Sequence, residues 1–131
     1  MNSINFTGKI LLVDDEVHIR KYVSLILKQL GQPIISEAGD GVEALAAYEA
    51  NKPDFVLLDV NMPQMDGLET LQKLMKLDPD CVVVMLTSLA NRETVERALE
   101  YGAVSYIRKD TPKEEIAKAL AETIAACAKR K

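Results

Sequence analysis

The chain has 131 residues, of which 48% are hydrophobic and 27% are charged, and its formal net charge is −4. This composition is typical of one compact domain that buries a hydrophobic core without disulfides. We expect a single domain over residues 1–131, with its core at about residues 9–127. The 20 acidic residues outnumber the 16 basic ones, which argues against direct DNA binding as the main task.

The sequence lacks the signals of a membrane or secreted protein. No apolar run approaches the roughly 20 residues needed to span a bilayer, and the start of the chain lacks the regions of a secretory signal. Cys81 and Cys127 stand far apart without metal-ligand spacing, and a reducing compartment would keep both as buried thiols. We therefore expect a cytoplasmic protein without membrane partners.

Short apolar runs rich in β-branched residues alternate with longer segments of helical period along the chain. This alternation predicts an α/β fold built from five strand–helix units. The predicted strands are Lys9–Val13, Ile34–Glu37, Phe55–Asp59, Cys81–Thr87 and Ser105–Arg108. Runs this apolar suit a parallel sheet that helices cover on both faces.

Apolar stripes at helical spacing place three of the helices. The first stripe consists of Ile19, Tyr22, Val23, Ile26 and Leu30. Gly31 is expected to end that helix. A helix is expected over 91–101, with Val95, Ala98 and Leu99 facing the core. The stripe of the last helix consists of Ile116, Leu120, Ile124 and Cys127.

Capping signals indicate where helices begin. Asp40 with Glu43, and Asp66 with Glu69, have the spacing of a cap followed by an acidic residue in the first turn. Thr111 is predicted to cap the last helix.

Polar residues follow four of the predicted strands. The first strand leads into Asp14 and Asp15, the third ends in Asp59, the fourth ends in Thr87, and the fifth leads into Lys109. Ligands of open parallel sheets bind beyond the carboxyl ends of the strands. We therefore expect three carboxylates, a hydroxyl and an ammonium group to meet at one edge.

Three carboxylates at one edge call for a cation. Two of them about 4 Å apart repel by roughly 4 kcal/mol at an effective dielectric of 20. Oxygen ligands without histidine or thiolate favour Mg²⁺, or Mn²⁺, over zinc or copper. A phosphoryl group in transfer requires a metal, a cation and hydrogen-bond donors. Mg²⁺, Lys109 and Thr87 would supply these, with a carboxylate as the nucleophile.

Simpler interpretations remain for single residues. An acidic residue after a strand can act only as a helix cap, and this alternative stays open for Asp14, Asp15 and Glu16. His18, the only histidine, is expected to lie on the surface of the first helix rather than to carry a phosphoryl group.

Together these residues resemble the signature of a response regulator receiver domain, from two-component phosphorelay systems. The resemblance rests on Asp14-Asp15, the segment DVNMPQMDG over 59–67, Thr87-Ser88 and Lys109. It implies a flavodoxin-like three-layer sandwich with a five-stranded parallel sheet in the order 2-1-3-4-5. It also implies a signalling phosphoacceptor rather than an enzyme.

The resemblance implies a role for each residue of the site. Asp59 would be the phosphoacceptor, and Mg²⁺ would be held by Asp14, Asp15, Asp59 and the backbone carbonyl of Asn61. Lys109 would pair with the phosphoryl group.

Further positions in the resemblance concern switching. Thr87 would hydrogen-bond the phosphoryl group, and Tyr106 would follow it by turning inward. Asn61 and Leu89 occupy positions that tune how long the phosphoryl group lasts. Asp110 stands where the family usually has proline, often after a cis peptide bond, and adds a negative charge near the site.

The implied partners are a histidine kinase or a histidine phosphotransfer protein as donor, and a downstream protein that binds the face of the fourth helix, fifth strand and fifth helix.

Three alternative functions stay open. An aspartate-based phosphatase is the first, although it normally has a second acid where Asn61 stands. A flavin- or nucleotide-binding domain would need a glycine- or hydroxyl-rich loop at Asp14-Asp15-Glu16. A degenerate receiver that acts as a constitutive interaction module is the third.

Overall fold

A computed structural model describes residues 6–60, 62, 65–88 and 92–128 of the chain. Five parallel strands form one sheet in the order β2-β1-β3-β4-β5. The strands are β1 (Lys9–Val13), β2 (Ile34–Ala38), β3 (Phe55–Leu58), β4 (Val83–Thr87) and β5 (Ser105–Arg108). The flavodoxin-like strand order that we expected is therefore confirmed.

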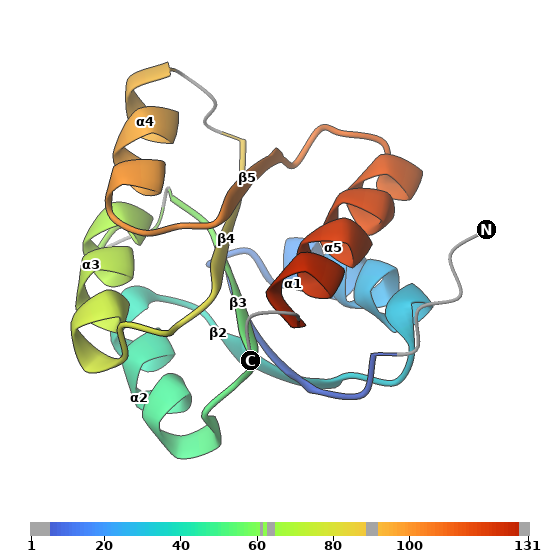
Figure 1. Cartoon of the computed structure of the whole chain (residues 1–131), viewed down its shortest axis with the longest axis horizontal. Coiled ribbons are helices and arrows are strands. Elements are labelled where there is room, and N and C mark those ends of the chain that lie inside the picture. The colour runs from blue at the N-terminus through green and yellow to red at the C-terminus, as the bar shows by residue number, and fades with distance from the viewer. Residues whose placement is uncertain (1–5, 61, 63–64, 89–91, 129–131) are drawn as a thin grey trace.

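Helices cover both faces of the sheet (Figure 1). The α-helices are α1 (Val17–Leu27), α2 (Gly41–Asn51), α3 (Gly67–Leu77), α4 (Arg92–Glu100) and α5 (Lys113–Ala128). Helices α1 and α5 lie on one face, whereas α2, α3 and α4 lie on the other (Figure 1). None of the described helices is long and apolar enough to cross a bilayer.

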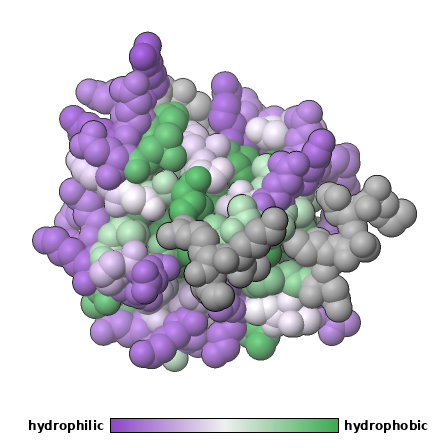
Figure 2. Space-filling view, viewed as in Figure 1, coloured by the Kyte–Doolittle hydropathy of each residue, from purple (hydrophilic) through white to green (hydrophobic). Residues whose placement is uncertain are grey.

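The sheet separates two hydrophobic cores. Along β1, Ile10 and Leu12 pack toward α1 and α5, whereas Leu11 and Val13 pack toward α2 and α3, because successive side chains of a strand point to opposite faces. All four side chains are buried, which explains why the run is apolar throughout rather than alternating. The face of the molecule shown in Figure 2 is mainly hydrophilic, with separate hydrophobic patches.

The predicted caps of α2 and α3 are confirmed. The Asp40 carboxylate accepts a hydrogen bond from the Glu43 N–H at 2.8 Å, and the Asp66 carboxylate accepts one from the Glu69 N–H at 2.9 Å. The predicted cap of α5 is wrong by one residue. The Pro112 carbonyl accepts the first hydrogen bond of α5, from the Ile116 N–H at 3.0 Å. The Thr111 N–H donates to the Arg108 carbonyl in the turn before the helix.

Two residues predicted to face inward are exposed. Tyr22 is 41% exposed and Leu99 is 48% exposed. Helix α1 is α-helical only to Leu27 and ends in a short 3-10 turn, Lys28–Leu30, before Gly31 at φ 140°. Leu30 reaches the core from this 3-10 turn, whose spacing differs from that of the regular α-helix assumed in the prediction. Helix α4 packs against β5 and α3, and its contact is narrow enough that Ala98 alone is fully buried among its described residues.

Candidate functional site

The predicted site residues meet at the carboxyl end of the sheet. Asp14, Asp59 and Lys109 follow β1, β3 and β5 directly, and Thr87 is the last residue of β4. Asp14, Asp59 and Thr87 are at most 3% exposed. Buried polar side chains are costly unless they are paired, so this edge is built for polar chemistry rather than for packing alone.

Three carboxylates form the acidic part of the site. Asp14, Asp15 and Asp59 each offer an oxygen, and these atoms all lie within 4.8 Å of one another. Hydrogen bonds hold the backbone beneath them: the Asp14 N–H donates to Ala38 and the Asp59 N–H donates to Val13. Asp15 is exposed, whereas the other two are buried, so the cluster opens to solvent on the Asp15 side. This set of oxygen donors fits a hard divalent cation.

Lys109 supplies the positive charge of the site. Its Nζ lies 2.5 Å from Asp14 Oδ2 and 3.4 Å from Asp59 Oδ2. Burial alone would lower the pKa of Lys109, but the hydrogen bond with Asp14 and the charge of Asp59 outweigh it, so the pKa is raised. With three carboxylates and one ammonium group, the site has a formal charge of −2, which one divalent cation would balance.

The capping alternative accounts for little of this cluster. Glu16 stands at the N-cap of α1, and its side chain makes no capping hydrogen bond. Asp14 Oδ1 accepts a hydrogen bond from the Glu16 N–H at 2.9 Å, which leaves its other oxygen for Lys109. Asp14 therefore supports the turn into α1 and belongs to the charged site as well.

Gly67 is a site residue that we did not single out from the sequence. A Cβ at this position would overlap the backbone carbonyl of Asp59 and lie 2.6 Å from Val60 Cα. The Gly67 N–H also donates to the Val60 carbonyl at 2.7 Å. Glycine therefore lets α3 begin directly against the backbone that carries Asp59. The signal in the sequence is the Asp66-Gly67 pair, in which Asp66 caps α3 and Gly67 is the first residue of the helix.

Tyr106 is turned inward. Its hydroxyl is buried and has no hydrogen-bond partner among the described residues. Burial raises the pKa of Tyr106, and the charge of Asp59 adds to the rise while Arg108 opposes it. The ring packs at the margin of the core beneath α2, α3 and α4. The Asp59 carboxylate therefore contributes to the electrostatic environment of the Tyr106 hydroxyl.

The extra carboxylate of Asp110 is paired on the surface. Arg108 donates from Nε to Asp110 Oδ1 at 3.0 Å and from Nη2 to Oδ2 at 2.7 Å. Both side chains are exposed, and no peptide bond among the described residues is cis. The Asp110 carboxylate is therefore paired with Arg108 and is not part of the acidic cluster.

The remaining predicted residues lie apart from the site or outside the described chain. The His18 side chain is 75% exposed on α1, 3.8 Å from Glu16, as expected of a surface histidine. Asn61 and Leu89 lie outside the described residues. Cys81 and Cys127 are free and buried, as predicted.

Comparison with known proteins is consistent with this geometry. The family model of the response regulator receiver domain matches residues 10–121. The chain is 37% identical over 112 residues to the chemotaxis protein CheY of Listeria monocytogenes, covering 86% of this chain and 94% of that protein. It is 40% identical over 111 residues to the transcriptional regulatory protein YhcZ of Bacillus subtilis, covering 84% of this chain and 52% of that protein.

Solved structures give the same result. The CheX–CheY–BeF3–Mg²⁺ complex from Borrelia burgdorferi matches with a TM-score of 0.85 and 31% identity, over 89% of each chain. A CheY-like receiver domain protein from Methanospirillum hungatei matches with a TM-score of 0.87 and 29% identity, over 96% of this chain and 100% of that one. No enzymatic family is indicated by these matches. The chain belongs to the response regulator receiver domain family and is CheY-like.

Proposed function

We propose that this chain is a phosphorylation-controlled switch in which Asp59 accepts a phosphoryl group in the presence of Mg²⁺. The observation that carries the proposal is the position of Asp59. Its carboxylate is buried, lies 3.4 Å from the Lys109 ammonium and shares a cluster with two further carboxylates. A carboxylate in this setting has the partners that an aspartyl-phosphate nucleophile needs.

Asp14, Asp15 and Asp59 would hold the cation, Mg²⁺ or Mn²⁺, together with the backbone carbonyl of Asn61. When bound, Mg²⁺ would neutralise charge on the phosphoryl oxygens. An Asp59 oxygen would attack phosphorus, and the bond between phosphorus and the donor nitrogen would break with its electron pair leaving on that nitrogen. Lys109 would pair with the transferred group, and Thr87 would donate a hydrogen bond to it.

The transferred group would then change the surface of the protein. Thr87 ends β4 opposite Arg108 of β5, and Tyr106 is paired with Met85, two residues before Thr87. A shift of Thr87 toward the phosphoryl group would be passed to Tyr106 and to the face formed by α4, β5 and α5. Asn61 and Leu89 would set how long the phosphoryl group lasts.

The donor would be a histidine kinase or a histidine phosphotransfer protein, and the output would be binding of a downstream protein to the α4–β5–α5 face. Helix α4 and helix α5 both contact β5, and Leu99 of α4 is exposed. The solved Borrelia complex, in which CheY is bound to CheX with BeF3 and Mg²⁺, supports a mode of action through protein binding.

The proposal is tested by phosphorylation with acetyl phosphate and Mg²⁺. The wild-type chain should take up a labile phosphoryl group, and Asp59→Asn should take up none. Asp80→Asn is a matched control, because Asp80 is exposed and follows α3 rather than a strand end; this variant should be labelled like the wild type. Equal labelling of Asp59→Asn would contradict the assignment.

The alternatives predict other results. An aspartate-based phosphatase would turn over a generic phosphate monoester steadily, whereas the switch should not. A constitutive interaction module would show no change in melting temperature with beryllofluoride and Mg²⁺, whereas the switch should be stabilised, since a ligand that binds only the folded state raises its stability.

A further inference from the structure

Arg20 connects three elements at the border of the site. It lies on α1, and its side chain is only 16% exposed. Nη1 donates to the backbone carbonyl of Asp14 at 2.5 Å, and Nε donates to Glu37 Oε1 at 2.8 Å. One guanidinium group therefore joins α1 to the residue after β1 and to the carboxyl-terminal half of β2.

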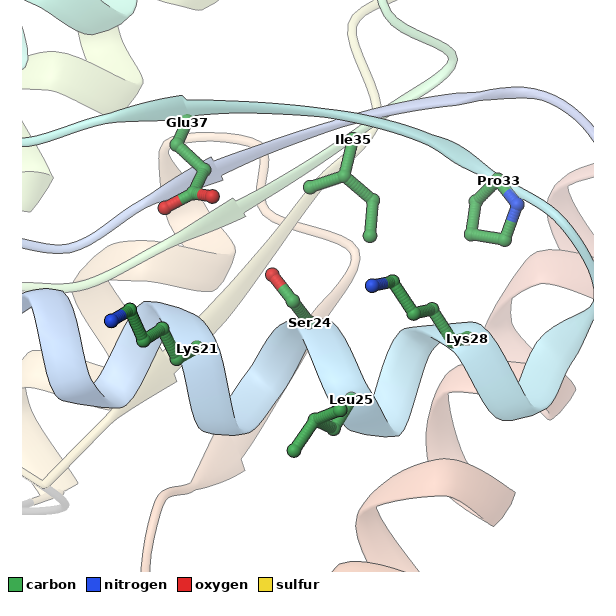
Figure 3. Close-up of a pocket in the computed structure, with 7 residues that line it drawn as sticks. All are labelled: Lys21, Ser24, Leu25, Lys28, Pro33, Ile35 and Glu37. Atoms are coloured by element: carbon green, nitrogen blue, oxygen red, sulfur yellow. The ribbon is translucent and has the colours of Figure 1, made fainter.

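The rest of the interface between α1 and β2 is more open. A groove of about 580 Å³ runs between them, lined by Lys21, Ser24, Leu25, Lys28, Pro33, Ile35 and Glu37. In Figure 3, Glu37 points from the strand toward α1 at one end of the groove, and Ser24 points into the gap from the helix. Because Glu37 lies near the carboxyl end of β2, the ion pair with Arg20 links helix and strand at the end that borders the site.

The contact with Asp14 bears directly on the acidic cluster. The Asp14 carbonyl lies in the same planar peptide unit as the N and Cα atoms of Asp15. A hydrogen bond that fixes this carbonyl therefore also fixes the N–Cα bond of Asp15, which leaves φ of Asp15 as the one backbone rotation that sets where its side chain begins. Asp15 is the exposed member of the cluster, so it has the fewest neighbours to hold it in place.

We propose that Arg20 is a positioning residue for the divalent cation, acting through the Asp14-Asp15 peptide and held in place by Glu37. The inference rests on the proposed function of this site. Arginine suits the task because its donors form a rigid fork that can reach two acceptors at once, whereas lysine offers a single point charge. Outer partners of metal ligands contribute strongly to affinity, typically about 10- to 100-fold.

The sign of the effect separates positioning from electrostatics. Arg20 is a cation, so its charge alone opposes binding of Mg²⁺ nearby, and removing that charge would tighten binding. Loss of positioning would weaken it. Arg20→Met should therefore bind Mg²⁺ about tenfold more weakly, and Arg20→Lys should also be weakened although its charge is kept.

The experiment is a Mg²⁺ titration of the full chain, followed by backbone amide NMR shifts, with melting temperatures recorded for each variant. Lys21→Gln is the matched control, because it removes the neighbouring exposed cation of α1 and should not weaken binding. Glu37→Gln keeps an acceptor for Nε and should retain most of the affinity, whereas Glu37→Ala should lose part of it.

Each outcome bears on a separate claim. If folded Arg20→Met and Arg20→Lys bind Mg²⁺ as tightly as the wild type, the positioning role is overturned while the proposed function stands. If the wild type itself binds no Mg²⁺, both are overturned. Should Arg20→Met fail to fold, the pair Arg20→Lys and Glu37→Ala still decides the matter, because weakened binding in both supports the proposal and unchanged binding in both overturns it.

Discussion

At the scale of single residues, one ammonium group is shared between two buried carboxylates. Lys109 lies 2.5 Å from Asp14 and 3.4 Å from Asp59, and Asp15 adds a third carboxylate within 4.8 Å of the others. The carboxylates repel one another in the folded chain because their negative charge exceeds the positive charge of Lys109. We infer that this repulsion lowers the stability of the metal-free protein and raises its affinity for a cation.

The repulsion between the carboxylates predicts that removing one of them stabilises the metal-free protein. Asp15→Asn should raise the free energy of unfolding by about 1 kcal/mol, a value kept small because Asp15 is exposed and solvent screens its charge. Urea unfolding in the presence of EDTA measures the change. The gain on adding Mg²⁺ should be smaller in this variant than in the wild type, and Asp80→Asn should differ from the wild type in neither. A destabilised Asp15→Asn would contradict the account.

At the scale of elements, the start of α3 lies directly on the backbone that carries Asp59. Gly67 allows this approach, and the Asp66 cap sets where the helix begins. The position of Asp59, the proposed phosphoacceptor, thus depends on a contact between a helix start and a strand end, and not on its own side chain alone.

Gly67→Ala should therefore disturb both stability and the site. The added methyl group meets backbone atoms that cannot rotate away, and overpacking of this kind costs about 1–3 kcal/mol. Urea unfolding should show that loss, and labelling by acetyl phosphate should slow as well. Gly39→Ala is the matched control, since its Cβ would meet its nearest atoms at 3.5 and 3.6 Å, an ordinary contact distance. Equal effects of the two substitutions would contradict the explanation.

The elements also show what a sequence can predict. The bounds of β1 and β5 matched the prediction; for β1, an apolar run between polar residues is a local signal. The caps at Asp40 and Asp66 were confirmed because a cap also depends only on residues close in sequence. The inward orientation predicted for Tyr22 and Leu99 was wrong. The exposure of a helical side chain depends on how much of the helix its neighbours cover, and the spacing of apolar residues does not reveal this.

The site was predictable only in part. Asp14, Asp59, Thr87 and Lys109 meet where the strand ends predicted them, because parallel strands bring their carboxyl ends to one edge. The contact of Arg20 with the Asp14 carbonyl was not predictable. That contact depends on the packing of α1 against β1 and β2. In the sequence alone, Arg20 cannot be distinguished from an exposed basic residue on a helix.

At the scale of the whole molecule, a second polar cluster lies at the opposite end of the sheet. The Tyr48 hydroxyl donates to Asp78 Oδ2 at 2.7 Å, and Cys81 lies just before β4. Burial raises the pKa of the Cys81 thiol to about 11, although the hydrogen bond with Tyr48 opposes the rise. Burial, followed by the hydrogen bond to Asp78, raises the pKa of Tyr48 as well. Both groups are neutral in the folded chain at neutral pH.

This cluster predicts a loss of stability at alkaline pH. A group whose pKa is raised by folding contributes its full stability below its unfolded pKa, near 9 for the thiol, and loses it as the pH rises through the folded value. Cys81 should contribute roughly 2–3 kcal/mol that disappears between about pH 9 and pH 11. Thermal melts of wild type and Cys81→Ala over this range measure it. The wild type should lose stability more steeply, and parallel curves would contradict the prediction.

The central claim is that Asp59 forms a covalent bond to phosphorus, and reductive trapping tests it most directly. After incubation with acetyl phosphate and Mg²⁺, borohydride converts an aspartyl phosphate to homoserine, which peptide mass spectrometry locates. We predict homoserine at position 59, formed only when Mg²⁺ is present. Modification at another residue, or none in a chain that remains folded, would contradict the account.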